Sequence, residues 1–134
     1  MYLALLTERE KIVFLGMAYN IATIDGDYSD AEKAMINGYC HELQCQFDEN
    51  TMIKPMESLI QAIKVNSSEK TKKIFVFELI GLSLADVNYG SDERKLISQM
   101  LTEYNIDSDF ANKCESMVSE YIGFQGRINK LILG

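Results

Sequence analysis

IATIDGDYSDAE, residues 21–32, contains the predicted end of one helix and the start of the next. Gly26 suits the left-handed backbone that commonly follows a helix. Ser29 and Glu32 have the spacing of a capping box, in which both side chains accept bonds from backbone N–H groups at the start of a helix. The segment therefore predicts two helices joined by a short acidic turn.

Apolar residues with helical spacing continue on both sides of this segment. A second capping box, Thr7 with Glu10, predicts that the upstream helix begins there and runs to about Ile24. The downstream helix is expected to reach about Cys45. The upstream helix is apolar on nearly all sides, so we expect it to lie at the centre of the fold.

The same pattern recurs 61 residues later, where residues 82–93 read LSLADVNYGSDE. Asp25 then corresponds to Asp86, and Glu32 to Glu93. Further matched pairs at this offset are Phe14 with Phe75, Tyr28 with Tyr89, Lys33 with Arg94, Ile36 with Ile97 and Glu42 with Glu103. Each unit consists of an apolar helix, an acidic turn and an amphipathic helix, which predicts a duplicated helical hairpin.

We therefore predict an all-α, compact bundle of about six helices, built from two hairpin repeats related by a pseudo-twofold axis. A chain of 134 residues suits one domain with its own core. The expected parts of this domain, 1–134, are a first repeat at about 7–45, a connecting helix at about 51–66, a second repeat at about 68–106 and a C-terminal helix at about 108–132. In that last helix, apolar residues follow the 3–4 rhythm of a helix face: Phe110, Cys114, Met117, Val118, Tyr121, Ile122, Phe124, Ile128 and Ile132.

The net charge of −7 argues against non-specific nucleic-acid binding, which requires a basic surface to displace counterions. It also disfavours direct docking on anionic lipid. The longest apolar stretch, residues 74–85, is interrupted by Glu78 and is shorter than the roughly 20 residues that span a bilayer. Three cysteines without a secretory leader are typical of a reduced intracellular protein. We expect a cytoplasmic protein that does not insert into membranes.

Residues 21–32 resemble the signature of the tellurite-resistance TerB-like family, with small apolar residues, Asp-Gly, and a Glu seven positions after the Asp. Residues 84–93 resemble a degenerate second copy, with Val87 in place of the glycine and Gly90 in place of the serine. The resemblance spans roughly Leu5 to Ile122. It implies an all-helical fold with two related halves, and a cytoplasmic protein of tellurite-resistance or other stress systems, often linked to membrane-associated complexes. It implies no family-wide enzymatic activity.

The resemblance also implies a divalent-cation site at the acidic motif residues, here Asp25, Glu32, Asp86 and Glu93. Asp25 lies at the negative end of a helix dipole, where a cation or backbone N–H groups must offset its charge. If the halves face each other, four carboxylates would suit Ca²⁺, Mg²⁺ or Mn²⁺. Capping alone is the alternative, because the capping box needs no metal. An EF-hand is excluded, since Ile36 occupies the position of its essential glutamate.

Other chemistry has little support in the sequence. Cys40, His41 and Cys45 do not share one helix face, which argues against zinc. Glu78, within an apolar helix, is expected to be satisfied by partners or to lie at an edge. The cluster Lys70, Lys72 and Lys73 is interpreted as a solvated face.

The leading hypothesis is a nonenzymatic, stress-associated binding module with an acidic site for a divalent cation. A metal-independent protein-interaction adaptor is the alternative, with the groove between the halves or the C-terminal helix as its surface. A third hypothesis is a metal-assisted hydrolase that uses the same four carboxylates. We assign no catalytic or cofactor-binding residue. The expected partner is a protein, through which the chain could associate peripherally with a membrane, and not a nucleic acid.

Overall fold

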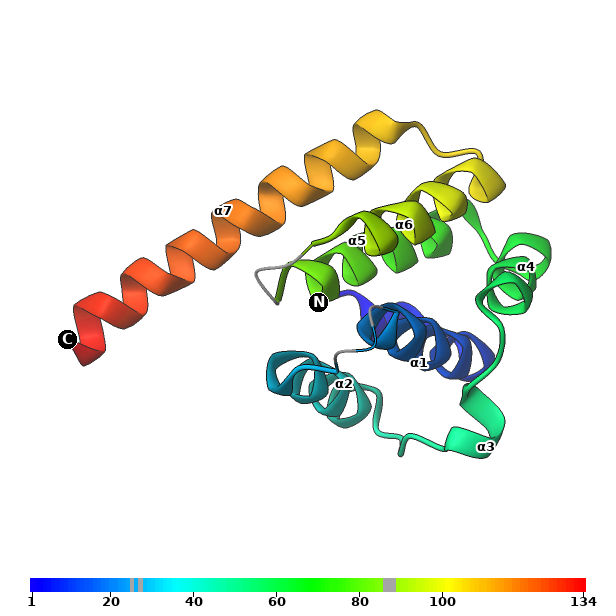
Figure 1. Ribbon diagram of the computed structural model, residues 1–134, viewed down its shortest axis with the longest axis horizontal. Coiled ribbons are helices and arrows are strands. Elements are labelled where there is room, and N and C mark those ends of the chain that lie inside the picture. Colours follow the sequence, from blue (N-terminus) through cyan, green and yellow to red (C-terminus); the bar gives the residue numbers. More distant parts are fainter. Residues whose placement is uncertain (25, 27, 86–88) are drawn as a thin grey trace.

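The structure, a computed structural model, describes residues 1–24, 26, 28–85 and 89–134. Over these residues the chain is helical and contains no strand (Figure 1). Its elements are the 3₁₀-helix η1 (Leu3–Leu5) and the α-helices α1 (Glu8–Thr23), α2 (Asp30–Leu43), α3 (Glu49–Met52), α4 (Met56–Asn66), α5 (Glu69–Ala85), α6 (Ser91–Tyr104) and α7 (Ser108–Leu133). The prediction of a compact all-α fold is confirmed.

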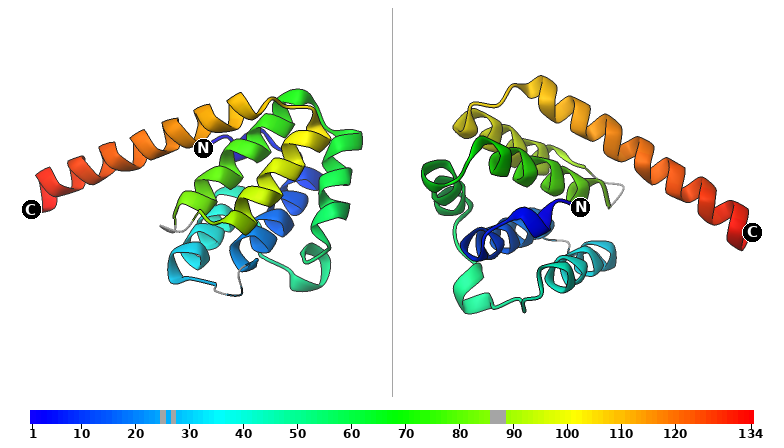
Figure 2. Two further views of the ribbon diagram at one scale, coloured as in Figure 1. Left: turned by 45° about the horizontal axis from the view of Figure 1, so that its top comes forward. Right: turned by 180° about the vertical axis from the view of Figure 1, so that it is seen from behind.

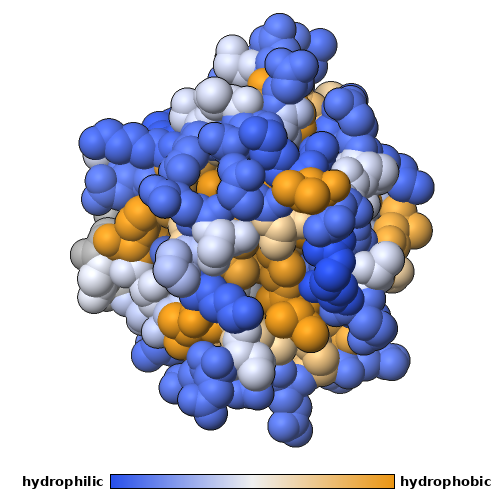
Figure 3. Space-filling view, turned by 90° about the vertical axis from the view of Figure 1, so that its right-hand side faces the viewer, coloured by the Kyte–Doolittle hydropathy of each residue, from blue (hydrophilic) through white to orange (hydrophobic). Residues whose placement is uncertain are grey.

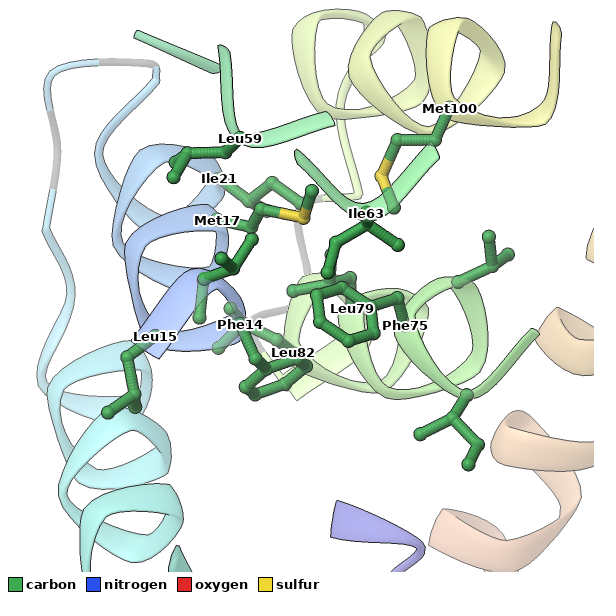
Figure 4. Packing of buried hydrophobic residues seen from close by; sticks show 14 of the residues in the cluster. Phe14, Leu15, Met17, Ile21, Leu59, Ile63, Phe75, Leu79, Leu82 and Met100 are labelled. Atoms are coloured by element: carbon green, nitrogen blue, oxygen red, sulfur yellow. The ribbon is translucent and has the colours of Figure 1, made fainter. Parts of the chain in front are cut away.

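The core is built around α1 and α5, the two helices that are apolar on nearly all sides. They pack against each other, while α2 and α4 also cover α1, and α6 and α7 also cover α5. Phe14 and Phe75, both fully buried, meet edge to face between the two central helices, with ring centroids 5.5 Å apart. Met17, Ile63 and Met100 complete the same interior from α1, α4 and α6 (Figure 4).

The predicted capping boxes form at the starts of α1 and α2, and both reciprocal bonds are present in each. The helix boundaries of the second half then follow those of the first half at the sequence offset: α5 begins 61 residues after α1, and α6 begins and ends 61 residues after α2. The residues that end α2 and α6, Gln44 and Asn105, are both left-handed, with φ of 54° and 55°. Gly26 is left-handed as expected, with φ of 80°.

The connection between the halves differs from the single helix expected at about 51–66. It is divided into the short α3 and the longer α4. Pro55 disfavours helical backbone in the residue before it, so α3 ends before the proline and α4 begins after it. The Asn20 side chain holds the intervening segment against α1, because its Nδ2 donates to the Lys54 carbonyl at 2.9 Å.

The last helix, α7, lies along α5 with its first half and extends beyond the body with its second half (Figures 1 and 2). Cys114 is the one residue of α7 that is fully buried. A bidentate ion pair fixes the attached half, since Arg94 on α6 donates to both oxygens of Glu115 at 2.9 and 3.3 Å. The opposite end of the molecule, around α3 and α4, shows apolar patches separated by hydrophilic side chains (Figure 3).

Candidate functional site

Two of the four predicted metal ligands lie within the described residues, and both are buried. Glu32 and Glu93 are each the third residue of their helix, α2 and α6, and are 3% and 4% exposed. They therefore occupy the same position in the two halves. Asp25 and Asp86 lie outside the described residues, so the expected four-carboxylate cluster remains a prediction.

Glu32 acts as the capping partner of Ser29. Its Oε1 accepts bonds from the Ser29 backbone N–H at 3.2 Å and from the Ser29 hydroxyl at 3.0 Å. In return, the Glu32 backbone N–H donates to the Ser29 Oγ at 3.1 Å. These bonds stabilise the start of α2, so the capping interpretation accounts for the position of Glu32 without a metal.

Glu93 is buried to the same extent although its helix has a different cap. Gly90 occupies the N-cap position of α6 and offers no side chain, so Glu93 cannot form the reciprocal pair seen in the first half. Its neighbours still match those of Glu32. Arg94 stacks over the Tyr89 ring at 4.0 Å, as Lys33 lies over the Tyr28 ring at 5.4 Å.

The electrostatic surroundings of the two tyrosines are also similar. Burial raises the pKa of Tyr89 to about 12, an effect that Arg94 opposes and that Glu115 and Glu93 reinforce. Burial likewise raises the pKa of Tyr28, with Glu32 among the smaller contributors. Both phenols therefore stay protonated at neutral pH beside a buried glutamate.

Within the part of the chain that the structure describes, no three His, Cys, Asp or Glu side chains are grouped to hold a metal ion. The Cys40, His41 and Cys45 side chains border one shallow surface hollow. Burial raises the pKa of both cysteine thiols, which disfavours the thiolates that zinc requires.

Glu78 has a structural role. Its carboxylate is buried and accepts bonds from the Met1 amino group at 2.7 Å and from the Tyr2 N–H at 2.8 Å. The expectation of a satisfied glutamate is confirmed. Of the lysines that open α5, Lys72 and Lys73 lie over the rings of Tyr104 and Phe110 at 5.9 and 5.6 Å.

The most exposed apolar surface is the second half of α7. Met117, Phe124 and Leu131 are 63%, 54% and 81% exposed, and Tyr121 and Ile128 lie between them on the helix. Where α7 meets α5, the surface has a hollow of about 400 Å³ with Phe77, Phe110, Cys114 and Met117 among its lining residues. Burial raises the pKa of the Cys114 thiol to about 11, so this cysteine behaves as an apolar residue.

Sequence analysis identified the apolar rhythm of α7 but not that half of this helix would leave the body. The periodicity shows which residues share a face, and it carries no information on what covers that face. Among the described residues, no helix is both long and apolar enough to cross a membrane. Comparisons with protein-family models, curated proteins and solved structures found no match to this chain.

Proposed function

We propose that this chain is a nonenzymatic protein-interaction module and that the second half of α7 is its binding surface. The observation that supports this most directly is the exposed apolar face of that segment, which continues the face that the first half packs on α5. Contiguous exposed apolar patches mark interaction sites in proteins. The TerB-like resemblance would place such a module in a cytoplasmic stress response.

The energetics of an isolated helix support the same proposal. A helix of about 15 residues without tertiary packing is only marginally stable in water. The projecting segment also contains Gly123 and Gly126, and a glycine inside a helix costs about 0.5–1 kcal/mol relative to alanine. A partner that covers the apolar face would offset these costs, because burial of apolar side chains stabilises the helix that carries them.

We further propose that the two halves are related by the pseudo-twofold axis expected for a TerB-like fold. The constant offset between the helix boundaries supports this relation. Phe14 and Phe75, which correspond in the repeat, contact each other, as residues beside a twofold axis would. The cation–ring pairs in the two halves, Lys33 with Tyr28 and Arg94 with Tyr89, are likewise counterparts.

Photo-crosslinking in the cells that express the protein tests the binding surface. A photoreactive amino acid at Ile128 lies on the apolar face, whereas the same group at the neighbouring Asn129 points about 100° away from it. We expect discrete adducts from position 128, few from position 129, and loss of the adducts when Phe124→Asp is added. Equal labelling from both positions, or none from 128, would contradict the proposal.

A divalent-cation site is the second candidate function. It is supported by the burial of Glu32 and Glu93 at the same position in both halves, because buried carboxylates require compensation. Calorimetric titration with Ca²⁺, Mg²⁺ and Mn²⁺ should then give heat that the double variant Asp25→Ala/Asp86→Ala loses. Asp109→Ala, at an exposed position on α7, is the matched control. Absence of heat with all three cations would remove this candidate, and with it the hydrolase hypothesis.

A further inference from the structure

The apolar residues of α7 follow a strict heptad pattern over most of the helix. They are separated alternately by four and three residues: Phe110, Cys114, Met117, Tyr121, Phe124, Ile128 and Leu131. A sustained 3.5-residue spacing is the pattern of a helix that pairs with another helix in a left-handed coiled coil. The pattern therefore indicates a helical partner rather than an irregular one.

The two halves of this seam have different surroundings. Cys114 is buried, and Phe110 is half-buried against the body of the molecule. Beyond Met117 the seam residues are 42% to 81% exposed. Because a single line of side chains runs from the body into solvent, a partner helix on the outer half would continue an apolar contact that the body begins.

Resting on the proposed function, we propose that the partner is a second copy of this chain, and that the outer halves of two α7 helices pair in antiparallel orientation. In the proposed register, Tyr121 of each copy lies opposite Phe124 of the other, and Met117 lies opposite Ile128. The four resulting layers of side chains are related in pairs by the twofold axis of the dimer.

Charge complementarity selects this register. Glu120 and Arg127 border the seam on the same edge, seven residues apart. Antiparallel pairing places residues of this edge beside each other, so Glu120 of each copy meets Arg127 of the other. A shift of one heptad in either direction would instead bring Arg127 against Arg127, or Glu120 against Glu120. Parallel pairing would place Glu120 beside Gln125, and Arg127 beside Ile132.

Arg127 already lies next to the seam, since its guanidinium is 5.7 Å from the centre of the Phe124 ring. The proposed register also brings Leu131 of the second copy to the level of Cys114. This is the position of the apolar hollow of about 400 Å³ between α5 and α7. The end of the partner helix would thus lie against a recess that the body and α7 form together.

The area available suits a dimer of modest affinity. Six side chains would lose most of their exposure: Met117, Tyr121, Phe124, Ile128, Leu131 and Ile132. At about 100 Å² each, two copies would bury about 1,200 Å² in total, the lower end of the range for specific interfaces. We therefore expect a reversible dimer rather than a permanent one.

Sedimentation equilibrium of the purified full chain, from about 1 µM to about 500 µM, tests the dimer. The mass should rise with concentration from 15.2 kDa towards twice that value. Phe124→Asp, at an exposed position, should stay monomeric while its circular dichroism shows a folded body. Ser119→Asp, on the outer face of α7, introduces the same charge as a control and should leave dimerisation intact. A chain that stays monomeric throughout would overturn the proposal.

Charge exchange tests the antiparallel register. Glu120→Arg and Arg127→Glu, made singly, turn two attractive pairs into repulsive ones and should each raise the dissociation constant about tenfold. The double variant restores both pairs across the dimer and should return to within about twofold of the original value. Single variants without effect, or a double variant weaker than either single, would overturn the antiparallel register.

Failure of this inference is distinguishable from failure of the proposed function. If the purified chain is monomeric but position 128 crosslinks to a different protein in cells, the binding surface stands and the second copy is excluded. If the purified chain is monomeric and position 128 gives no adduct, both proposals fall.

Discussion

At the scale of single residues, Gly16 lies at the closest approach in the core. A Cβ at this position would lie 2.3 Å from the Met52 backbone oxygen and 3.1 Å from a Leu59 methyl group. The absence of a side chain therefore allows α1 to pack against the end of α3 and the start of α4. Gly38 on α2 is different, because a Cβ there would meet nothing within 4 Å.

This contrast predicts opposite effects of one substitution. Gly16→Ala should lower the free energy of unfolding by about 1–3 kcal/mol, because backbone atoms must separate to admit the methyl group. Gly38→Ala should raise it by about 0.5–1 kcal/mol, because alanine favours the helix and the space is open. Urea unfolding followed by circular dichroism measures both. Equal stability of the two variants would show that the α1–α3 contact is looser than described.

Glu10 predicts a pH dependence of stability. Burial by itself would raise the pKa of Glu10, but bonds from the Thr7 backbone, the Ser67 hydroxyl and the Thr7 side chain, with Arg9 nearby, lower it below the ordinary value of 4.5. The unfolded chain therefore takes up this proton first as the pH falls. The stabilisation from Glu10 is complete above about pH 4.5 and disappears as the pH falls through the lower folded pKa.

Glu10→Gln should accordingly cost about 1–2 kcal/mol at pH 7 and progressively less below pH 4.5. The matched control is Glu8→Gln in the same helical turn, where the side chain is 87% exposed and paired with Lys11. It should change stability by less than about 0.5 kcal/mol. A constant difference between Glu10→Gln and the original chain from pH 7 to pH 3 would contradict the argument.

At the scale of elements, the helix boundaries were largely predictable because they depend on local chemistry. Capping boxes at Thr7 and Ser29 need only residues three positions apart, and both form. The interruption at Pro55 also has a local cause, but its neighbours favour helix on both sides, so one continuous helix was expected there. Glu93 shows the limit of local reasoning, because its burial at α6 comes from packing and not from a cap.

The candidate site was less predictable than the elements because it depends on distances between them. The sequence placed Glu32 and Glu93 at equivalent helix positions, and the structure shows both buried there. Whether their carboxylates approach each other follows from the packing of the halves, which no spacing in the sequence states. The face of α7 has the same limitation. Its heptads were visible in the sequence, but its departure from the body depends on the length of α5 beneath it.

At the scale of the whole molecule, the projecting half of α7 couples stability to association. A partner that binds only the folded chain stabilises that chain by mass action, so the stability of a dimer rises with protein concentration. The second half of α7 is where this coupling would act, since the body protects only the first half of the helix in the monomer.

The melting temperature of the full chain should therefore increase with its concentration. Between about 5 µM and about 500 µM, a reversible dimer would gain up to about 2–3 kcal/mol, which corresponds to several degrees for a domain of this size. Phe124→Asp should melt at one temperature across that range, because it removes the contact and leaves the core around Phe14 and Phe75 unchanged. Differential scanning calorimetry measures both proteins. If the melting temperature of the original chain were equally independent of concentration, the exposed face of α7 would contribute nothing to the folded state through self-association.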